Sequence, residues 1–128
     1  GPGVIRNSTV RNCGRDGFII VGNLGDILLE NDLAENVGTN KLIPGGLTLA
    51  AGFNINYAYK PDTIPYEVIG WPTNVTVKNS IARDTQKVHT MTHAFVDYVQ
   101  PHHGKPNNKL INSKGSGYTT AEVVGFDD

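Results

Sequence analysis

The sequence predicts an all-β fold, a short parallel β-helix in which strands of successive coils stack into a solenoid. An eight-residue pattern that begins at Asn7 as NSTVRNCG returns as NDLAENVG at residues 31–38 and as NSIARDTQ at residues 79–86. Short β-branched runs bounded by Gly, Asn, Asp and Pro recur along the chain, as strands and turns do, and no segment shows helical spacing of apolar residues. Repeats of this length with such short strands fit coils of a parallel β-helix.

About four coils are expected, with a long aromatic insertion after the second. The step from Asn7 to Asn31 is 24 residues and the step from Asn31 to Asn79 is 48, twice as long, which indicates a regular period. A weaker copy starts at Leu110 as LINSKGSG. The strands are expected within residues 3–7, 16–22, 25–31, 45–50, 74–79, 94–99 and 119–126.

Stacking at the ordinary strand spacing of about 4.8 Å turns equal positions of the repeats into columns. Two columns are expected to point inward, one aliphatic and one of small residues at a bend. Two outer columns alternate in charge, which stabilises adjacent strands modestly. The four columns are Ile5/Leu29/Val77/Leu110, Val10/Ala34/Ala82/Gly115, Arg6/Glu30/Lys78 and Arg11/Glu35/Arg83.

A structural ladder of asparagines is expected at one turn, pointing inward. Asn tolerates unusual backbone angles there, and its amide can bond the next Asn in the stack. In the adjacent column, Asp32 stacks with two serines and is expected to face outward. The ladder residues are Asn7, Asn31, Asn79 and Asn112.

The stretch VIRNSTVRNCGRDGFIIVG, residues 4–22, resembles the repeat of the pectin-lyase-like right-handed parallel β-helix superfamily. The resemblance covers residues 3–38 and 75–86 well and residues 109–115 weakly. It implies a right-handed coil and a relationship to polysaccharide lyases, polygalacturonase-like hydrolases, alginate epimerases and phage tailspike depolymerases. It also implies an extracellular or virion-surface location, a polysaccharide partner and, by likeness to tailspikes, a homotrimer.

The composition predicts one domain spanning residues 1–128, a piece of a larger protein in which residues 1–2 are a tag scar. The formal net charge of -1 offers no electrostatic basis for a nucleic-acid or membrane partner. No cofactor and no metal site are expected, since the histidine spacings match no metal-binding motif. The only cysteine is Cys13, so no disulfide can form within the chain.

Two loop insertions, residues 51–73 and 100–108, interrupt the repeat and are expected to lie side by side. Aromatic rings can stack on sugar rings, and Lys and His can contact sugar hydroxyls or carboxylates. A glycan groove, a packed cap over the flank and a subunit interface remain as alternatives. The predicted substrate-binding residues are Tyr57, Tyr66, Trp71 and Lys105.

Catalysis is predicted only by residue type, as a polysaccharide lyase or a glycoside hydrolase. A hydrolase needs two carboxylates, and a lyase needs a base beside a cation. The Asp-Pro-His and Gly-His-Gly motifs of the resembled families are absent. The alternatives are a binding module without catalysis and a structural or oligomerisation segment of a spike or surface protein. The catalytic candidates are Tyr59, Lys60, Asp62, Glu67, His102 and His103.

Overall fold

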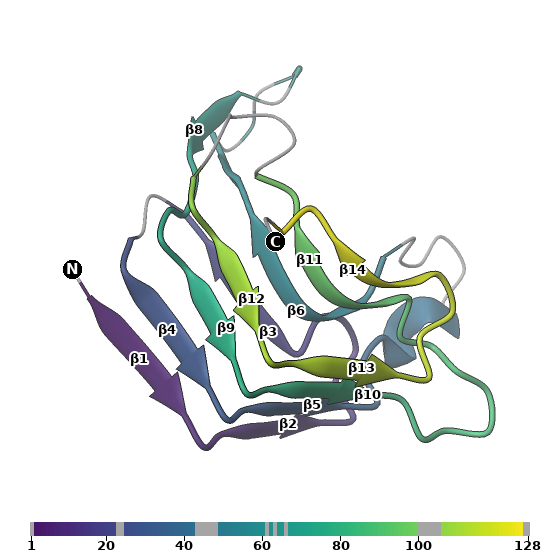
Figure 1. Ribbon diagram of the computed structural model, residues 1–128. Helices are drawn as coiled ribbons and strands as arrows, with labels where there is room; N and C mark the ends of the chain where they lie inside the picture. The colour runs from purple at the N-terminus through teal and green to yellow at the C-terminus, as the bar shows by residue number, and fades with distance from the viewer. Residues whose placement is uncertain are drawn as a thin grey trace.

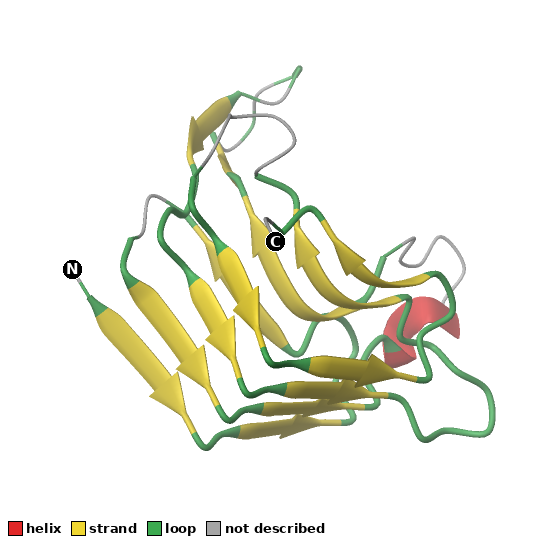
Figure 2. Cartoon of the chain, viewed as in Figure 1, coloured by secondary structure: helices red, strands yellow, loops and turns green. Residues whose placement is uncertain are grey.

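The computed structural model describes residues 2–22, 25–42, 49–60, 62, 64–65, 67–99 and 106–126. Within these residues the protein is all-β, and its main strands lie parallel in stacked sheets (Figures 1 and 2). A short 3-10 helix, η1 (Thr39–Leu42), is the sole helical element of the described part. No helix there is long and apolar enough to cross a membrane.

The chain visits three parallel four-stranded sheets in turn, four times over. The first sheet has the order β1-β4-β9-β12, the second β13-β10-β5-β2 and the third β14-β11-β6-β3. We call the four visits repeats 1 to 4. This arrangement is compatible with a parallel β-helix. The strands are, in repeat 1, β1 (Gly3–Arg6), β2 (Thr9–Arg11) and β3 (Phe18–Val21); in repeat 2, β4 (Ile27–Glu30), β5 (Leu33–Glu35) and β6 (Ala51–Asn56); in repeat 3, β9 (Thr76–Lys78), β10 (Ile81–Arg83) and β11 (His93–Asp97); and in repeat 4, β12 (Lys109–Ile111), β13 (Lys114–Ser116) and β14 (Ala121–Val124).

The strand register confirms the predicted columns. Leu29 pairs with Ile5 on one side and with Val77 on the other, and Val77 pairs with Leu110. In the second sheet Ala34 joins Val10 to Ala82, and Ala82 joins Gly115. The idea of a regular period is wrong, because Leu29 and Val77 are direct neighbours although 48 residues separate them. That step is one repeat enlarged by extra chain, and the next step, from Val77 to Leu110, has 33 residues.

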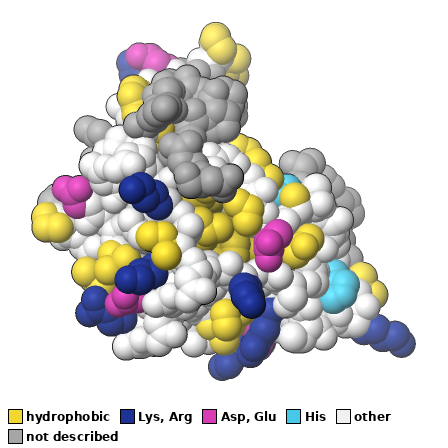
Figure 3. Space-filling view, viewed as in Figure 1, with side chains coloured by type: hydrophobic (Ala, Val, Ile, Leu, Met, Phe, Trp, Pro, Cys, Tyr) yellow, Lys and Arg dark blue, Asp and Glu magenta, His cyan; other side chains and the backbone are white. Residues whose placement is uncertain are grey.

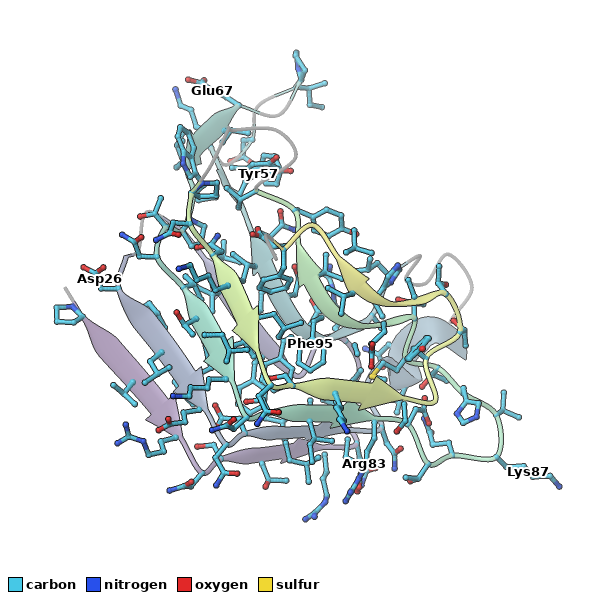
Figure 4. The ribbon with its side chains drawn as sticks, in the orientation of Figure 1. Asp26, Tyr57, Glu67, Arg83, Lys87 and Phe95 are labelled. Atoms are coloured by element: carbon cyan, nitrogen blue, oxygen red, sulfur yellow. The ribbon has the colours of Figure 1, made fainter. Side chains whose placement is uncertain are left out.

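A stack of three phenylalanines forms the centre of the core. The ring centroids of Phe18 and Phe53 lie 4.8 Å apart, and those of Phe53 and Phe95 lie 5.2 Å apart, both pairs nearly parallel. Leu29 and Ile55 are buried in the same cluster. Figure 4 shows Phe95 between the sheets. Equal residues stack here because the third sheet holds their strands in register.

The ladder asparagines adopt left-handed backbone angles, with φ of 55° at Asn7, 55° at Asn31, 51° at Asn79 and 47° at Asn112. Asn tolerates this region better than most residues. The Nδ2 atom of Asn31 donates to Oδ1 of Asn7 at 2.6 Å, and Nδ2 of Asn112 donates to Oδ1 of Asn79 at 2.8 Å. All four side chains are exposed. The expected inward direction is therefore wrong, because the chain bends around the core at this turn and the bend turns the amides outward.

The next column forms a ladder from side chain to backbone. The N–H of Ser8 donates to Oδ1 of Asp32 at 2.9 Å, the N–H of Asp32 to Oγ of Ser80 at 3.2 Å, and the N–H of Ser80 to Oγ of Ser113 at 3.0 Å. Each side chain therefore accepts a backbone hydrogen bond from the repeat before it. Asp32 is only 2% exposed, so the expectation that it faces outward is wrong. A side chain that bonds the neighbouring turn has to lie inside the stack.

The outer charge columns form ion pairs between repeats. Arg6 Nε lies 2.7 Å from Glu30 Oε1, and Glu35 accepts from Arg11 Nε at 3.1 Å and from Arg83 Nε at 2.6 Å. The hydrogen bond from Arg83 and the further bond from Arg11 lower the pKa of Glu35, against a smaller opposing effect of burial. The alternation of charge read from the sequence is thus present in space.

The first insertion, predicted as a loop over residues 51–73, is largely strand. Ala51–Asn56 is β6, which lies between β3 and β11 in the third sheet. The expected strand at residues 45–50 is wrong where it can be judged, since Leu49 and Ala50 precede β6 without forming a strand. The remaining chain forms an antiparallel hairpin of β7 (Ala58–Tyr59) and β8 (Val68–Gly70), which projects beyond the sheets in Figure 1.

Most of the second insertion, residues 100–108, falls outside the described residues. Its last residues, Pro106 to Asn108, lead into β12. Asn108 is fully buried, and its Oδ1 accepts from the N–H of Val75 at 2.9 Å. This end of the insertion is thus a turn of the stack, held by the same kind of side-chain bond as the serine column.

Candidate functional site

A hollow of about 350 Å³ lies on the outer side of the third sheet. Phe53 and Ile55 of β6 point into the core, so the alternate residues Asn54 and Asn56 belong to the opposite face. Figure 4 shows Tyr57 at the base of the hairpin, beyond the end of β6. We call this hollow the tyrosine groove. It is lined by Arg15, Leu49, Asn54, Asn56, Tyr57, Tyr59 and Tyr98.

Asp16 holds the amide end of the groove in place. Its Oδ1 accepts from the N–H of Ala51 at 2.8 Å, and its Oδ2 accepts from Nδ2 of Asn54 at 3.2 Å. Asn54 is 3% exposed, and its Oδ1 has no hydrogen-bond partner among the described residues. The carboxylate thus orients a buried amide rather than facing the hollow as a free acid.

The tyrosines of the groove hold one another. The hydroxyl of Tyr57 donates to the carbonyl oxygen of Tyr98 at 2.8 Å. The rings of Tyr57 and Tyr59 meet edge to face, with centroids 6.0 Å apart. Tyr57 is 9% exposed and Tyr59 is 45% exposed. The ring of Tyr59 is therefore open to a ligand, and Tyr57 supports it from below.

Burial raises the pKa of Tyr57, and nearby Tyr59 and Asp97 raise it further. Burial also raises the pKa of Tyr98, with a contribution from Asp16. Both phenols are therefore neutral near pH 7 and serve as hydrogen-bonding groups. A tyrosine that removes a proton from a substrate needs the opposite shift, since it has to ionise near the working pH.

The structure brings together only some of the predicted site residues. Tyr57 and Tyr59 line the groove. Lys60, Asp62 and Glu67 are exposed on the hairpin and do not line it; the N–H of Lys60 donates to the carbonyl oxygen of Glu67 at 2.8 Å. Trp71 is partly buried and packs against the core. The other four predicted residues, Tyr66, His102, His103 and Lys105, lie outside the described residues.

Four residues of the groove were missed by sequence reasoning. Asn54 and Asn56 carry a readable signal, because GFNIN alternates apolar and polar residues as a half-buried strand does. Arg15 and Tyr98 carry none, since they come from repeats 1 and 3 and reach the groove only through the register of the third sheet.

A second cluster, around Asp84, is structural. Its carboxylate accepts from the N–H groups of Gln86 at 3.0 Å, Thr90 at 2.7 Å and Met91 at 2.9 Å. Burial raises the pKa of Asp84, but these backbone bonds together outweigh it and the net effect is a lowered pKa. His89 Nδ1 lies 3.4 Å from the same carboxylate. The cluster orders the connection from β10 to β11.

A second hollow, of about 420 Å³, lies at repeat 4. Figure 3 shows hydrophobic side chains at the centre of this side of the molecule, in the space that β12, β13 and β14 surround. The residues that line this hollow are Asn79, Ser80, Ile81, Asn112, Lys114, Gly115 and Ser116.

Comparisons of the chain with family models, with curated proteins and with solved structures found no match. In the described part of the chain, no three His, Cys, Asp or Glu side chains are grouped as metal ligands would be. What the tyrosine groove offers chemically is one open aromatic ring, amide groups and a single guanidinium.

Proposed function

We propose that this chain is a four-coil, right-handed parallel β-helix module, similar to the pectin-lyase-like superfamily, that binds polysaccharide outside the cell or on a virion surface. The order in which the chain visits its three sheets supports the solenoid. The repeat in residues 4–22 supports the hand and the relationship. The tyrosine groove supports the ligand class.

The observation that carries the proposal is the composition of this groove. Sugar rings present apolar faces and hydroxyl edges, which suit aromatic rings beside amide groups. Tyr59 offers an open ring, while Asn56 and Arg15 lie within the same hollow. Because the Tyr57 hydroxyl and the Asp16 carboxylate are already bonded, the surface is arranged before any ligand arrives.

Binding is proposed ahead of cleavage. Hydrolysis uses two carboxylates about 5 to 10 Å apart, and no pair of carboxylates lines the described groove. Tyr57 and Tyr98, with raised pKa values, are unsuited to act as the base of a lyase. Lyase or hydrolase activity therefore needs residues of the hairpin or of residues 100–105.

The test is binding to a panel of bacterial capsular and plant acidic polysaccharides, with polymer size and unsaturated ends measured in parallel. We expect Tyr59→Ala to weaken binding about tenfold, because an open ring that stacks on a sugar contributes on the order of 1 kcal/mol or more. Tyr118→Ala is the matched control, since Tyr118 is 38% exposed and lies outside the groove. Equal losses in both variants, or no binding to any polymer, would contradict the proposal.

A second candidate function is that of an oligomerisation segment in a spike-like homotrimer. One observation favours it: Ile64 is 97% exposed and Ile69 is 56% exposed on the projecting hairpin. Apolar side chains in such positions are typical of a contact with a partner. Sedimentation of Ile64→Ser beside the unaltered protein separates the two candidates, because only a hairpin interface loses its assembly.

A further inference from the structure

The two ends of the stack are complementary edges. Repeat 1 has repeat 2 as its neighbour on one side, and repeat 4 has repeat 3. Strands β1, β2 and β3 therefore form one edge, and β12, β13 and β14 form the other. An unpaired strand edge is a template for another strand. The inference below concerns these edges and does not depend on the tyrosine groove.

Backbone hydrogen bonds at the asparagine turn run in one direction along the stack. The N–H groups of Asn7, Asn31 and Asn79 donate to carbonyl oxygens of the following repeat, at 3.1, 3.0 and 3.0 Å. Among the described residues, nothing accepts from the N–H of Asn112. At the opposite edge, the carbonyl oxygen of Arg6 accepts only the hydroxyl of Ser8 in the described part. Its equivalent in repeat 3, the carbonyl oxygen of Lys78, accepts both a serine hydroxyl and the N–H of Asn31.

The side-chain ladders continue the same direction. In the serine column each N–H is bonded by a side chain of the following repeat, so the N–H of Ser113 lacks the acceptor that a fifth repeat would supply. Ser8 presents a hydroxyl oxygen at the other edge, with its proton donated to its own turn as in Ser80 and Ser113. Within the described residues, Asn112 also has no donor to its Oδ1, and Asn7 Nδ2 has no acceptor.

The apolar columns also match from edge to edge. Continuing the register places Phe18 of a second copy on Val123, which extends the Phe95 column and is 41% exposed. It places Ile5 on Leu110, both partly buried, and Val10 on Gly115, which lines the hollow of repeat 4. Each contact repeats a pairing of aliphatic or small residues already present inside the stack.

Charges at the two edges do not oppose one another. Arg6 and Arg11 stand in the columns that alternate in sign, and repeat 4 ends these columns with the neutral Ile111 and Ser116. The basic residues of repeat 4, Lys109 and Lys114, stand in columns where repeat 1 has Val4 and Thr9. No directly facing pair of a head-to-tail contact therefore carries like charges.

We propose that two copies of this chain associate head to tail, with repeat 1 of one copy seated on repeat 4 of the other. Strands β1, β2 and β3 then extend the three sheets in register. Such a contact does not close on itself, so further copies add and the assembly lengthens with protein concentration.

The first test uses opposite charges at one exposed position. Ile111 is 42% exposed and would face Arg6 of the second copy. Ile111→Glu places a carboxylate there as Glu30 already does for Arg6, and Ile111→Lys places a like charge. We expect the two variants to differ about fivefold in association constant by sedimentation at low salt, with Glu tighter. The difference should fade in high salt. Melting temperatures check that both variants fold.

The second test fixes the orientation of the contact. In a Cys13→Ser background, Arg6→Cys combined with Ile111→Cys should give a ladder of multimers with a short bifunctional thiol reagent, because facing strand residues lie about 4.8 Å apart. Either cysteine alone should give no ladder. The proposal fails if the protein stays monomeric at high concentration, if both Ile111 variants associate equally at low salt, or if Ile111→Cys alone links copies, which indicates a symmetric contact.

Discussion

Asp32 is a buried carboxyl in a column otherwise made of serines. Burial raises its pKa above the ordinary value of 3.8, against weaker lowering by the N–H of Ser8. The native state therefore holds this proton more tightly than the unfolded chain, and the stability it contributes is lost as the pH rises above 3.8. We expect Asp32→Ser to raise the free energy of unfolding by about 1 kcal/mol near pH 7, because an incompletely satisfied buried oxygen is removed.

Urea unfolding at two pH values measures this effect. The gain of Asp32→Ser over the unaltered protein should shrink near pH 4, where protonated Asp32 no longer carries a buried charge. Ser80→Ala serves as a control in the same column: it removes an acceptor from the N–H of Asp32 and should destabilise at both pH values. A loss of stability in Asp32→Ser near pH 7 would show that the carboxylate is needed.

Asp84 shows the opposite behaviour of a buried carboxyl. Its pKa is lowered, since backbone N–H groups bond the charged form, so its contribution is present above about 3.8 and is lost as the pH falls. We expect Asp84→Ala to cost about 3 kcal/mol or more near neutral pH, because three N–H groups lose a charged acceptor. Asp84→Asn keeps one oxygen and should fall between. Chemical unfolding measures both, and an Asp84→Ala variant as stable as the unaltered protein contradicts this role.

Single residues were predictable where the backbone dictates the side chain. The asparagines stand at the turn that the repeat predicts, since left-handed angles favour Asn. Their direction and the burial of Asp32 were not predictable, because a polar residue beside a turn carries no sign of which face it takes. Only the hydrogen bond from Ser8 to Asp32 explains its place.

Within the third sheet, the phenylalanine stack should show graded stability. Phe53 has a ring on each side and is 1% exposed, while Phe18 has one ring neighbour and is 9% exposed. We expect Phe53→Ala to cost about 3 to 5 kcal/mol and Phe18→Ala distinctly less, because an edge site relaxes and admits water. Urea unfolding of the two variants measures the order. Equal costs would mean that the end of the stack is as enclosed as its middle.

The misread strand β6 shows where element prediction failed. Its sequence AGFNIN alternates correctly, yet Gly52 and two asparagines favour a loop on composition. Gly52 is needed because a Cβ there would lie 2.4 Å from Cβ of Ala82 and 2.9 Å from the carbonyl oxygen of Ala94. Asn54 is buried by its bond to Asp16. Both reasons lie in other repeats, so no local pattern could reveal them.

Across the whole molecule, the sequence predicted the register better than the site. Repeated columns such as Ile5 and Leu29 identify the pairing directly, because stacked strands select similar residues at equal positions. The tyrosine groove joins Arg15, Tyr59 and Tyr98, which share no motif and meet only when three repeats stack. A site assembled across repeats becomes visible only once the register is known.

The last prediction concerns the hairpin, which is attached to the stack without belonging to its sheets. Strands β7 and β8 pair with each other alone, and Tyr59 pairs with Val68. Replacing residues 60–67 by Asn-Gly therefore joins paired strands through a two-residue turn. We expect an unchanged melting temperature and unchanged polysaccharide affinity, because Tyr57, Tyr59 and Tyr98 remain in place.

The same deletion removes Lys60, Asp62, Ile64 and Glu67 together, so its outcomes separate the alternatives. A loss of polysaccharide cleavage with binding retained would assign catalysis to the hairpin. A loss of assembly with binding retained would assign the exposed Ile64 to a subunit contact. Tyr59→Ala in the shortened chain is the control, and it should weaken binding as much as it does in the full hairpin. A shortened chain that folds but no longer binds would place the glycan site on the hairpin instead of the groove.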